Sequence, residues 1–157
     1  MLAKLKQFFG NPQATLSDEE RAEHLNLAAA SLLLEVVMAD ESMSEQEAKL
    51  LPDLLTTTLN LDPADAQHLI SDAKKSQEKS TSLYEFTQAI NDNFDVEQKQ
   101  QLILAMWRLA YADGHLCQYE DQIIRRTAEL FYLRHSELIQ MRNIAMEQQE
   151  IKRKEDK

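Results

Sequence analysis

The chain has 157 residues, enough for one domain that buries roughly two-thirds of the surface its unfolded form exposes. Only 2 glycines and 3 prolines accompany a 43% apolar composition, and apolar residues recur at helical spacing over long stretches, so we expect an all-α fold. The formal net charge of -10 argues against nucleic acid as a partner, because the phosphate backbone requires a basic face, and favours cations or basic proteins.

The sequence also indicates a compartment. Its single cysteine, Cys117, cannot form an internal disulfide, and the chain does not open with a signal peptide pattern, so we expect a cytoplasmic protein. The longest apolar run, 25–39, is shorter than the about 20 residues of a bilayer span and predicts a core helix. Residues 1–16 form an amphipathic segment that would either pack on its own domain or lie peripherally on a membrane or partner surface.

The rest of the chain is expected to form one helical domain over 17–147, followed by a charged tail at 148–157 that reads as a frayed helix end. The domain divides into halves at about 17–75 and 80–147. The polar run 71–81 is the predicted joint between them.

Capping patterns predict the helix starts. Ser17-x-x-Glu20 opens a helix that is apolar nearly all round, which is typical of the centre of a bundle. Ser44-x-x-Glu47 opens the next helix, which we expect to end at Asn60. Further helices are predicted to start at Asp62-Pro63, at Leu83 and at Asp95-x-x-Gln98, and to follow the second corner.

The stretch 32–51 has a second copy about 73 residues further along the chain. This shift pairs Asp40 with Asp113 and Glu47 with Glu120. In each copy an apolar helix runs into an Ala-Asp corner, and a second helix opens with a Glu seven positions after the Asp. We therefore predict an internal duplication that places equivalent corners near a pseudo-two-fold axis.

The acidic corners have a purely structural interpretation. Glu47 would close a capping box with Ser44, and Asp40 would bond to loop amides. In the second copy the cap position is Cys117, a weak hydrogen-bonding group, so capping explains Glu47 better than Glu120.

The alternative is a hard-cation site at Asp40, Glu47, Asp113 and Glu120, because carboxylates are the ligands that Ca²⁺ or Mg²⁺ takes. Two carboxylates about 4 Å apart repel by about 4 kcal/mol at an effective dielectric of about 20, so a positive charge should accompany them. The spacing is not that of an EF-hand, and one shared site or two separate ones would fit it. His115 suggests Zn²⁺ or Fe, but no second His or Cys lies at ligand spacing.

The corners resemble those of the tellurite-resistance TerB family and its relatives, which include the N-terminal domain of DjlA-type membrane co-chaperones. The family typically has an Ala-Asp-Gly corner followed by a helix-opening Glu, and the likeness spans about 25–141. The residues that carry it are Met38-Ala39-Asp40 with Met43-Ser44-x-x-Glu47, and Tyr111-Ala112-Asp113-Gly114-His115-Leu116 with Glu120.

The resemblance implies a single domain of about seven helices in two pseudo-symmetric halves, with an acidic metal-binding cluster at the matching Asp and Glu positions. The first copy departs from the pattern, because Glu41 stands where the second has Gly114. Glu41 would be a further ligand or mark a corner that turns differently. The family is linked to stress responses, tellurite resistance and membrane-associated complexes.

The sequence therefore predicts a non-enzymatic TerB-like module that binds a divalent cation and acts in stress response or as a protein-interaction scaffold. Its expected partner is a protein, with a membrane-associated complex and a homo-oligomer as alternatives. Two other functions stay open. One is a metal-dependent hydrolase in which the same carboxylates hold an activating ion and His115 acts as general base. The other is a metal-free adaptor whose acidic face binds a basic partner.

Overall fold

The computed structural model describes residues 18–39, 44–77, 83–112, 114 and 116–155, and over these ranges the protein is entirely helical. This confirms the all-α prediction and the expected number of helices. The amphipathic segment predicted at 1–16 lies outside the described residues. The seven described helices are α2 (Asp18–Val37), α3 (Glu45–Leu59), α4 (Pro63–Gln77), α5 (Leu83–Asn93), α6 (Val96–Ala110), α7 (Gln118–Leu130) and α8 (His135–Glu155).

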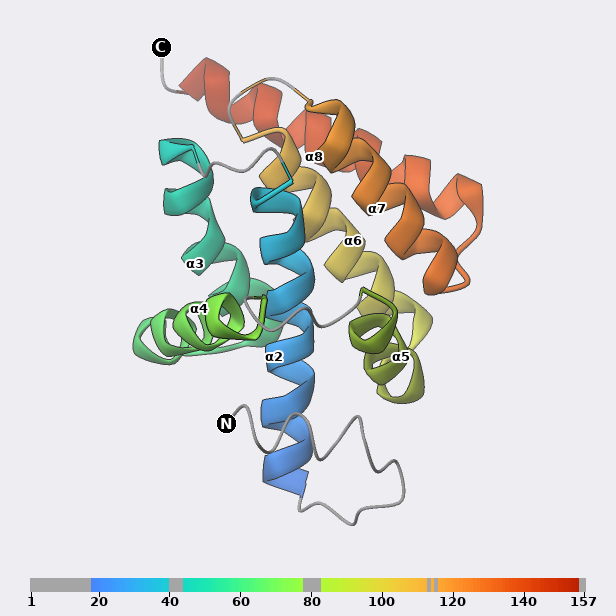
Figure 1. Ribbon diagram of the computed structural model, residues 1–157. Coiled ribbons are helices and arrows are strands. Elements are labelled where there is room, and N and C mark those ends of the chain that lie inside the picture. Colours follow the sequence, from blue (N-terminus) through green and yellow to red (C-terminus); the bar gives the residue numbers. More distant parts are fainter. Residues whose placement is uncertain (1–17, 40–43, 78–82, 113, 115, 156–157) are drawn as a thin grey trace.

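Helix α2 is the centre of the bundle. It runs through the middle of the molecule, with α3 and α4 on one side and α5 and α6 on the other, and it contacts all four of them and α7 (Figure 1). From Leu27 to Val37 its apolar side chains are buried on every side, because neighbouring helices cover it, and Glu35 stays partly exposed. The fully buried residues include Leu27, Leu32, Leu33, Leu34, Val36 and Val37.

Part of the polar run 71–81, which the sequence predicts as the joint between the two halves, belongs to helix α4. Helix α4 continues to Gln77, and the residues after it, 78–82, lie outside the described ranges. Ala73 in the middle of the run is fully buried, and Lys74 and Lys75 lie in the last turn, where positive charge is favourable. The joint between the two halves stays a prediction.

Helices α3 and α7 end in the same way. Asn60 after α3 and Tyr132 after α7 have positive φ angles of 56° and 61°. In each case the next residue donates its N–H back across the last turn, from Leu61 to the Thr56 carbonyl at 3.2 Å and from Leu133 to the Ala128 carbonyl at 3.0 Å. These are Schellman-type ends, in which glycine or asparagine normally takes the left-handed position.

Tyr132 is therefore strained in a position that suits a smaller residue. Its side chain is 82% exposed, so little packing would be lost on its removal. We expect Tyr132→Gly to raise the free energy of unfolding by up to about 1 kcal/mol, and the melting temperature by roughly 2–4 °C, in thermal denaturation. Tyr132→Ala keeps the unfavourable φ and should give no such gain; an equal gain from both variants would contradict this account.

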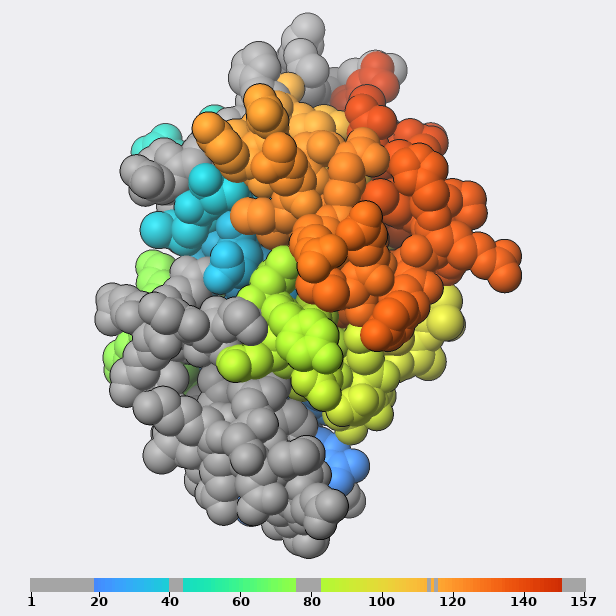
Figure 2. Space-filling model, turned by 45° about the vertical axis from the view of Figure 1, so that its right-hand side comes forward, coloured from blue at the N-terminus to red at the C-terminus, as the bar shows by residue number. Residues whose placement is uncertain are grey.

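Side chains from α5 and α6 fix the far end of α7. Asn91 donates to the Leu130 carbonyl at 2.7 Å, and the Lys99 ammonium donates to the Phe131 carbonyl at 3.5 Å. A cation at these last carbonyls also complements the helix dipole. Helices α5 (yellow-green), α7 (orange) and α8 (orange-red) lie side by side over one face of the molecule (Figure 2).

Side-chain hydrogen bonds also fix the start of helix α8. The Glu137 carboxylate accepts from the Arg134 backbone N–H at 2.9 Å and from the Gln100 amide on α6 at 2.6 Å. These two hydrogen bonds, the backbone one foremost, hold the pKa of Glu137 below its ordinary value because they favour the charged carboxylate. The start of α8 is thereby tied to α6, the helix that leads to the second corner.

Candidate functional site

The first corner connects the end of α2 to the start of α3. Helix α2 closes with bonds from Met38 to the Leu34 carbonyl and from Ala39 to the Val36 carbonyl. Ser44 then caps α3: its hydroxyl accepts from the Glu47 N–H, and the Glu47 carboxylate accepts from the Ser44 N–H, both at 3.1 Å. The predicted capping box is confirmed.

The second corner turns at Gly114, whose N–H donates to the Tyr111 carbonyl at 2.9 Å. Its φ of +86° lies in the left-handed region that suits glycine, which explains the Gly of the Ala-Asp-Gly corner. Helix α7 then begins after Cys117, and the Glu120 Oε1 atom accepts from the Cys117 N–H at 3.2 Å. Glu120 thus makes the same backbone capping bond as Glu47, but the Cys117 side chain forms no cap hydrogen bond in return, so of the two corners only the first has the full pair of capping bonds.

A capping role does not set these two glutamates apart from the rest of the chain. Gln98 accepts from the Asp95 N–H at the start of α6, and Glu137 does the same at the start of α8, and neither lies at a corner. What differs is burial. Glu47 is 5% and Glu120 6% exposed, whereas Gln98 is exposed and Glu137 half-buried.

Burial of a carboxylate is costly and is seldom found without hydrogen-bond donors or a cation close by. Each capping bond involves one oxygen, Oε1, of Glu47 or Glu120. A carboxylate has two oxygens with about four acceptor positions in all, so capping and metal ligation are compatible on one side chain. The two buried glutamates thus have the chemistry of hard-cation ligands.

Both corners lie at the same end of the bundle, because α2 and α6 both end at the top of the view in Figure 1. Four of the predicted ligands, Asp40, Glu41, Asp113 and His115, lie outside the described residues. Within the described ranges, no three His, Cys, Asp or Glu side chains come together in a group that could hold a metal ion.

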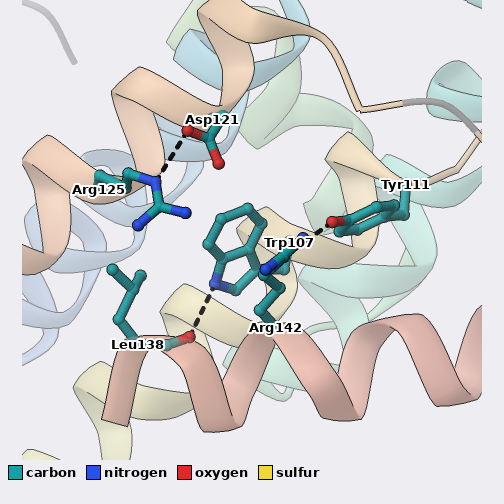
Figure 3. A network of polar contacts seen from close by, with 6 residues as sticks. All are labelled: Trp107, Tyr111, Asp121, Arg125, Leu138 and Arg142. Carbon is teal, nitrogen blue, oxygen red and sulfur yellow. Dashed lines mark hydrogen bonds and ion pairs between the residues drawn. The ribbon is translucent and has the colours of Figure 1, made fainter. Parts of the chain in front are cut away.

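Helix α8 holds the second corner through polar contacts that the sequence did not reveal. The Trp107 indole N–H donates to the Leu138 carbonyl at 3.2 Å, and the Arg142 Nε atom donates to the Tyr111 hydroxyl at 3.0 Å (Figure 3). Further along α8, the Gln149 amide donates to the Ala112 carbonyl at 3.3 Å. These three bonds join residues more than thirty positions apart, so no local pattern in the sequence could have indicated them.

A short ion pair lies beside this network. The Arg125 Nε atom and the Asp121 carboxylate on α7 are 2.8 Å apart, one turn after the second corner (Figure 3). Both side chains are partly exposed, so the pair contributes little to stability, of the order of 0.3–0.5 kcal/mol. It keeps the charge of Asp121 compensated on α7 itself.

Comparison with known proteins identifies the family of the chain. None of the helices in the described ranges is both long and apolar enough to span a bilayer. Neither curated proteins nor solved structures match the chain. The family model described as "Tellurite resistance protein TerB" matches residues 26–143, well over half of the chain and including both corners. The chain therefore belongs to the TerB family.

Proposed function

We propose that this TerB-family module binds a divalent cation, Ca²⁺ or Mg²⁺, at its two corners and acts without catalysis as a scaffold in a stress response. The proposed ligands are Asp40, Glu47, Asp113 and Glu120, with Glu41 and His115 as additional candidates. Carboxylates suit these hard cations better than they suit softer metals. With its single cysteine, the protein is assigned to the cytoplasm, where it could join a membrane-associated complex.

The observation that carries the proposal is the burial of Glu47 and Glu120 at matching positions in α3 and α7. Each follows an Asp by seven residues, and the two corners lie at one end of the bundle. A bound cation would offset the repulsion between carboxylates gathered there. The net charge of -10 further favours cation association.

Calorimetric titration of the chelator-stripped protein with Ca²⁺, Mg²⁺, Mn²⁺ and Zn²⁺ tests this function. We expect saturable binding of Ca²⁺ or Mg²⁺ that is lost in Asp40→Asn/Asp113→Asn. The matched control, Asp65→Asn/Asp92→Asn, removes the same charge from two exposed positions on α4 and α5 and should bind as the wild type does.

The stoichiometry distinguishes one shared site from two. If the corners share one ion, Asp40→Asn alone should abolish binding; if each corner holds its own, that variant should halve the number of ions bound. Undiminished binding in the variant with alanine at all four ligand positions would overturn the proposal. Absence of any heat would leave the glutamates as caps and favour the metal-free acidic adaptor.

A further inference from the structure

An open groove lies between the second corner and α8. Its volume is about 540 Å³, within the range of sites that hold a small ligand or a few side chains of a partner. Tyr111 and Gly114 line it from the corner, and the exposed face of α8 forms the opposite wall. The residues of α8 that line the groove are Asn143, Met146, Glu147, Gln149 and Glu150.

The groove is acidic with a small apolar part. Glu147 and Glu150 are exposed carboxylates, and neither forms an ion pair with a basic side chain in the described part of the chain. Met146 is 42% exposed, and the Tyr111 ring adds an aromatic surface. No Lys, Arg or His is among the described residues that line the groove. This lining fits a positively charged group on an aliphatic stem.

The α8 wall presents its residues at helical spacing. Met146 and Glu147 lie three and four positions after Asn143, and Glu150 lies four and three positions after those two, so all four share a face of the helix. The residues Leu138, Met141 and Ala145, which are buried, belong to the face that packs on the bundle. The lining face is thus available to a partner while the other face holds α8 in place.

Hydrogen bonds fix both walls before anything binds. Arg142 donates to the Tyr111 hydroxyl and thereby orients the ring (Figure 3). Gln149 donates to the Ala112 carbonyl and holds α8 against the corner. A site that is fixed in advance loses less conformational entropy on binding and so binds more tightly.

We infer that this groove binds a basic segment of a partner protein, one that carries Lys or Arg next to an apolar residue. Glu147 and Glu150 pair with the cationic groups, and Met146 and the Tyr111 ring contact the aliphatic stems, where the ring also attracts the cation. The net charge of -10 steers such a segment toward the protein. The inference extends the scaffold part of the proposed function and is independent of the cation part.

The probe is a fluorescein-labelled peptide of four arginines alternating with four leucines, followed by fluorescence polarisation at 100 mM NaCl with EDTA present. We expect Glu147→Gln/Glu150→Gln to weaken peptide binding at least tenfold. The matched control is Asp92→Asn/Glu97→Gln, which makes the same change in net charge at exposed positions near the opposite end of α6. It should change the affinity less than twofold.

A second variant tests the groove without altering charge. Asn143 is exposed, so Asn143→Trp should fill the groove without disturbing the core and should also weaken binding at least tenfold. Unchanged far-UV circular dichroism and melting temperature confirm that each variant is folded.

Three results would overturn the inference. Equal weakening by the two double variants would mean diffuse attraction to an acidic protein, and unaltered binding by Asn143→Trp would place the peptide elsewhere. Self-association of the wild type that Asn143→Trp abolishes would assign the groove to a second copy of the chain. Because EDTA is present, a loss of peptide binding is separate from any failure of cation binding at the corners.

Discussion

Replacing Trp107 with alanine should lower the free energy of unfolding by about 3–5 kcal/mol, a large part of the roughly 5–15 kcal/mol of a typical domain. Trp107 is fully buried in α6 and packs 6.2 Å from the Tyr111 ring, centroid to centroid. Its indole N–H also bonds to the Leu138 carbonyl, so the substitution leaves a cavity and removes a link between α6 and α8. Urea denaturation followed by circular dichroism measures the change.

Two variants separate packing from the hydrogen bond. Trp107→Phe keeps most of the ring but not the N–H, and we expect a loss of about 1–2 kcal/mol. Tyr119→Ala removes an aromatic ring that is 59% exposed on α7 and should change stability by no more than about 0.5 kcal/mol. A Trp107→Ala loss as small as that of Tyr119→Ala would mean that α8 does not depend on this contact.

A saturating divalent cation should stabilise the protein substantially if the corners bind it. At a concentration 100-fold above Kd, binding contributes about 2.7 kcal/mol, which corresponds to a rise of roughly 5–10 °C in melting temperature for a chain of this size. We expect Glu47→Gln/Glu120→Gln to abolish that rise. Without cation the same variant keeps the capping bond at each corner, because glutamine can accept it.

Another helix of this chain already has glutamine at the equivalent capping position. Gln98 accepts from the Asp95 N–H at 2.9 Å, as Glu47 and Glu120 accept from their own cap residues. Glu137→Gln is the matched control, since it changes an equivalent capping position away from the corners, and it should leave the cation-induced rise intact. A variant that melts lower in chelator but keeps the full rise would mean that the two buried glutamates are caps and not ligands.

The parts of the fold that the sequence predicted well depend on local signals. The capping boxes at Ser44 and Asp95 involve residues three positions apart, so their pattern is visible in the sequence and the structure has both. The helical part of the polar run 71–81 was not predicted, because the burial of Ala73 depends on distant helices and alanine carries little polarity signal.

The candidate site also has residues that local sequence signals predicted and residues that they did not. The sequence singled out Glu47 and Glu120 by their spacing, and the structure adds that both are buried, which no spacing could have indicated. The sequence did not single out Arg142 or Gln149, because their bonds to the second corner join one helix to another. Polar residues near the end of a chain also resemble a solvated tail. The ligand set at the corners stays a prediction.

The position of α2 has a consequence for how the chain gains its structure. This helix comes from the first half of the sequence, yet α5, α6 and α7 from the second half cover much of it. A nascent chain that ended before α5 would leave those apolar faces in water, where they would promote aggregation. The two halves therefore depend on each other for solubility, and the amides of α2 should be among the last to exchange with solvent, because they open only when the whole domain unfolds.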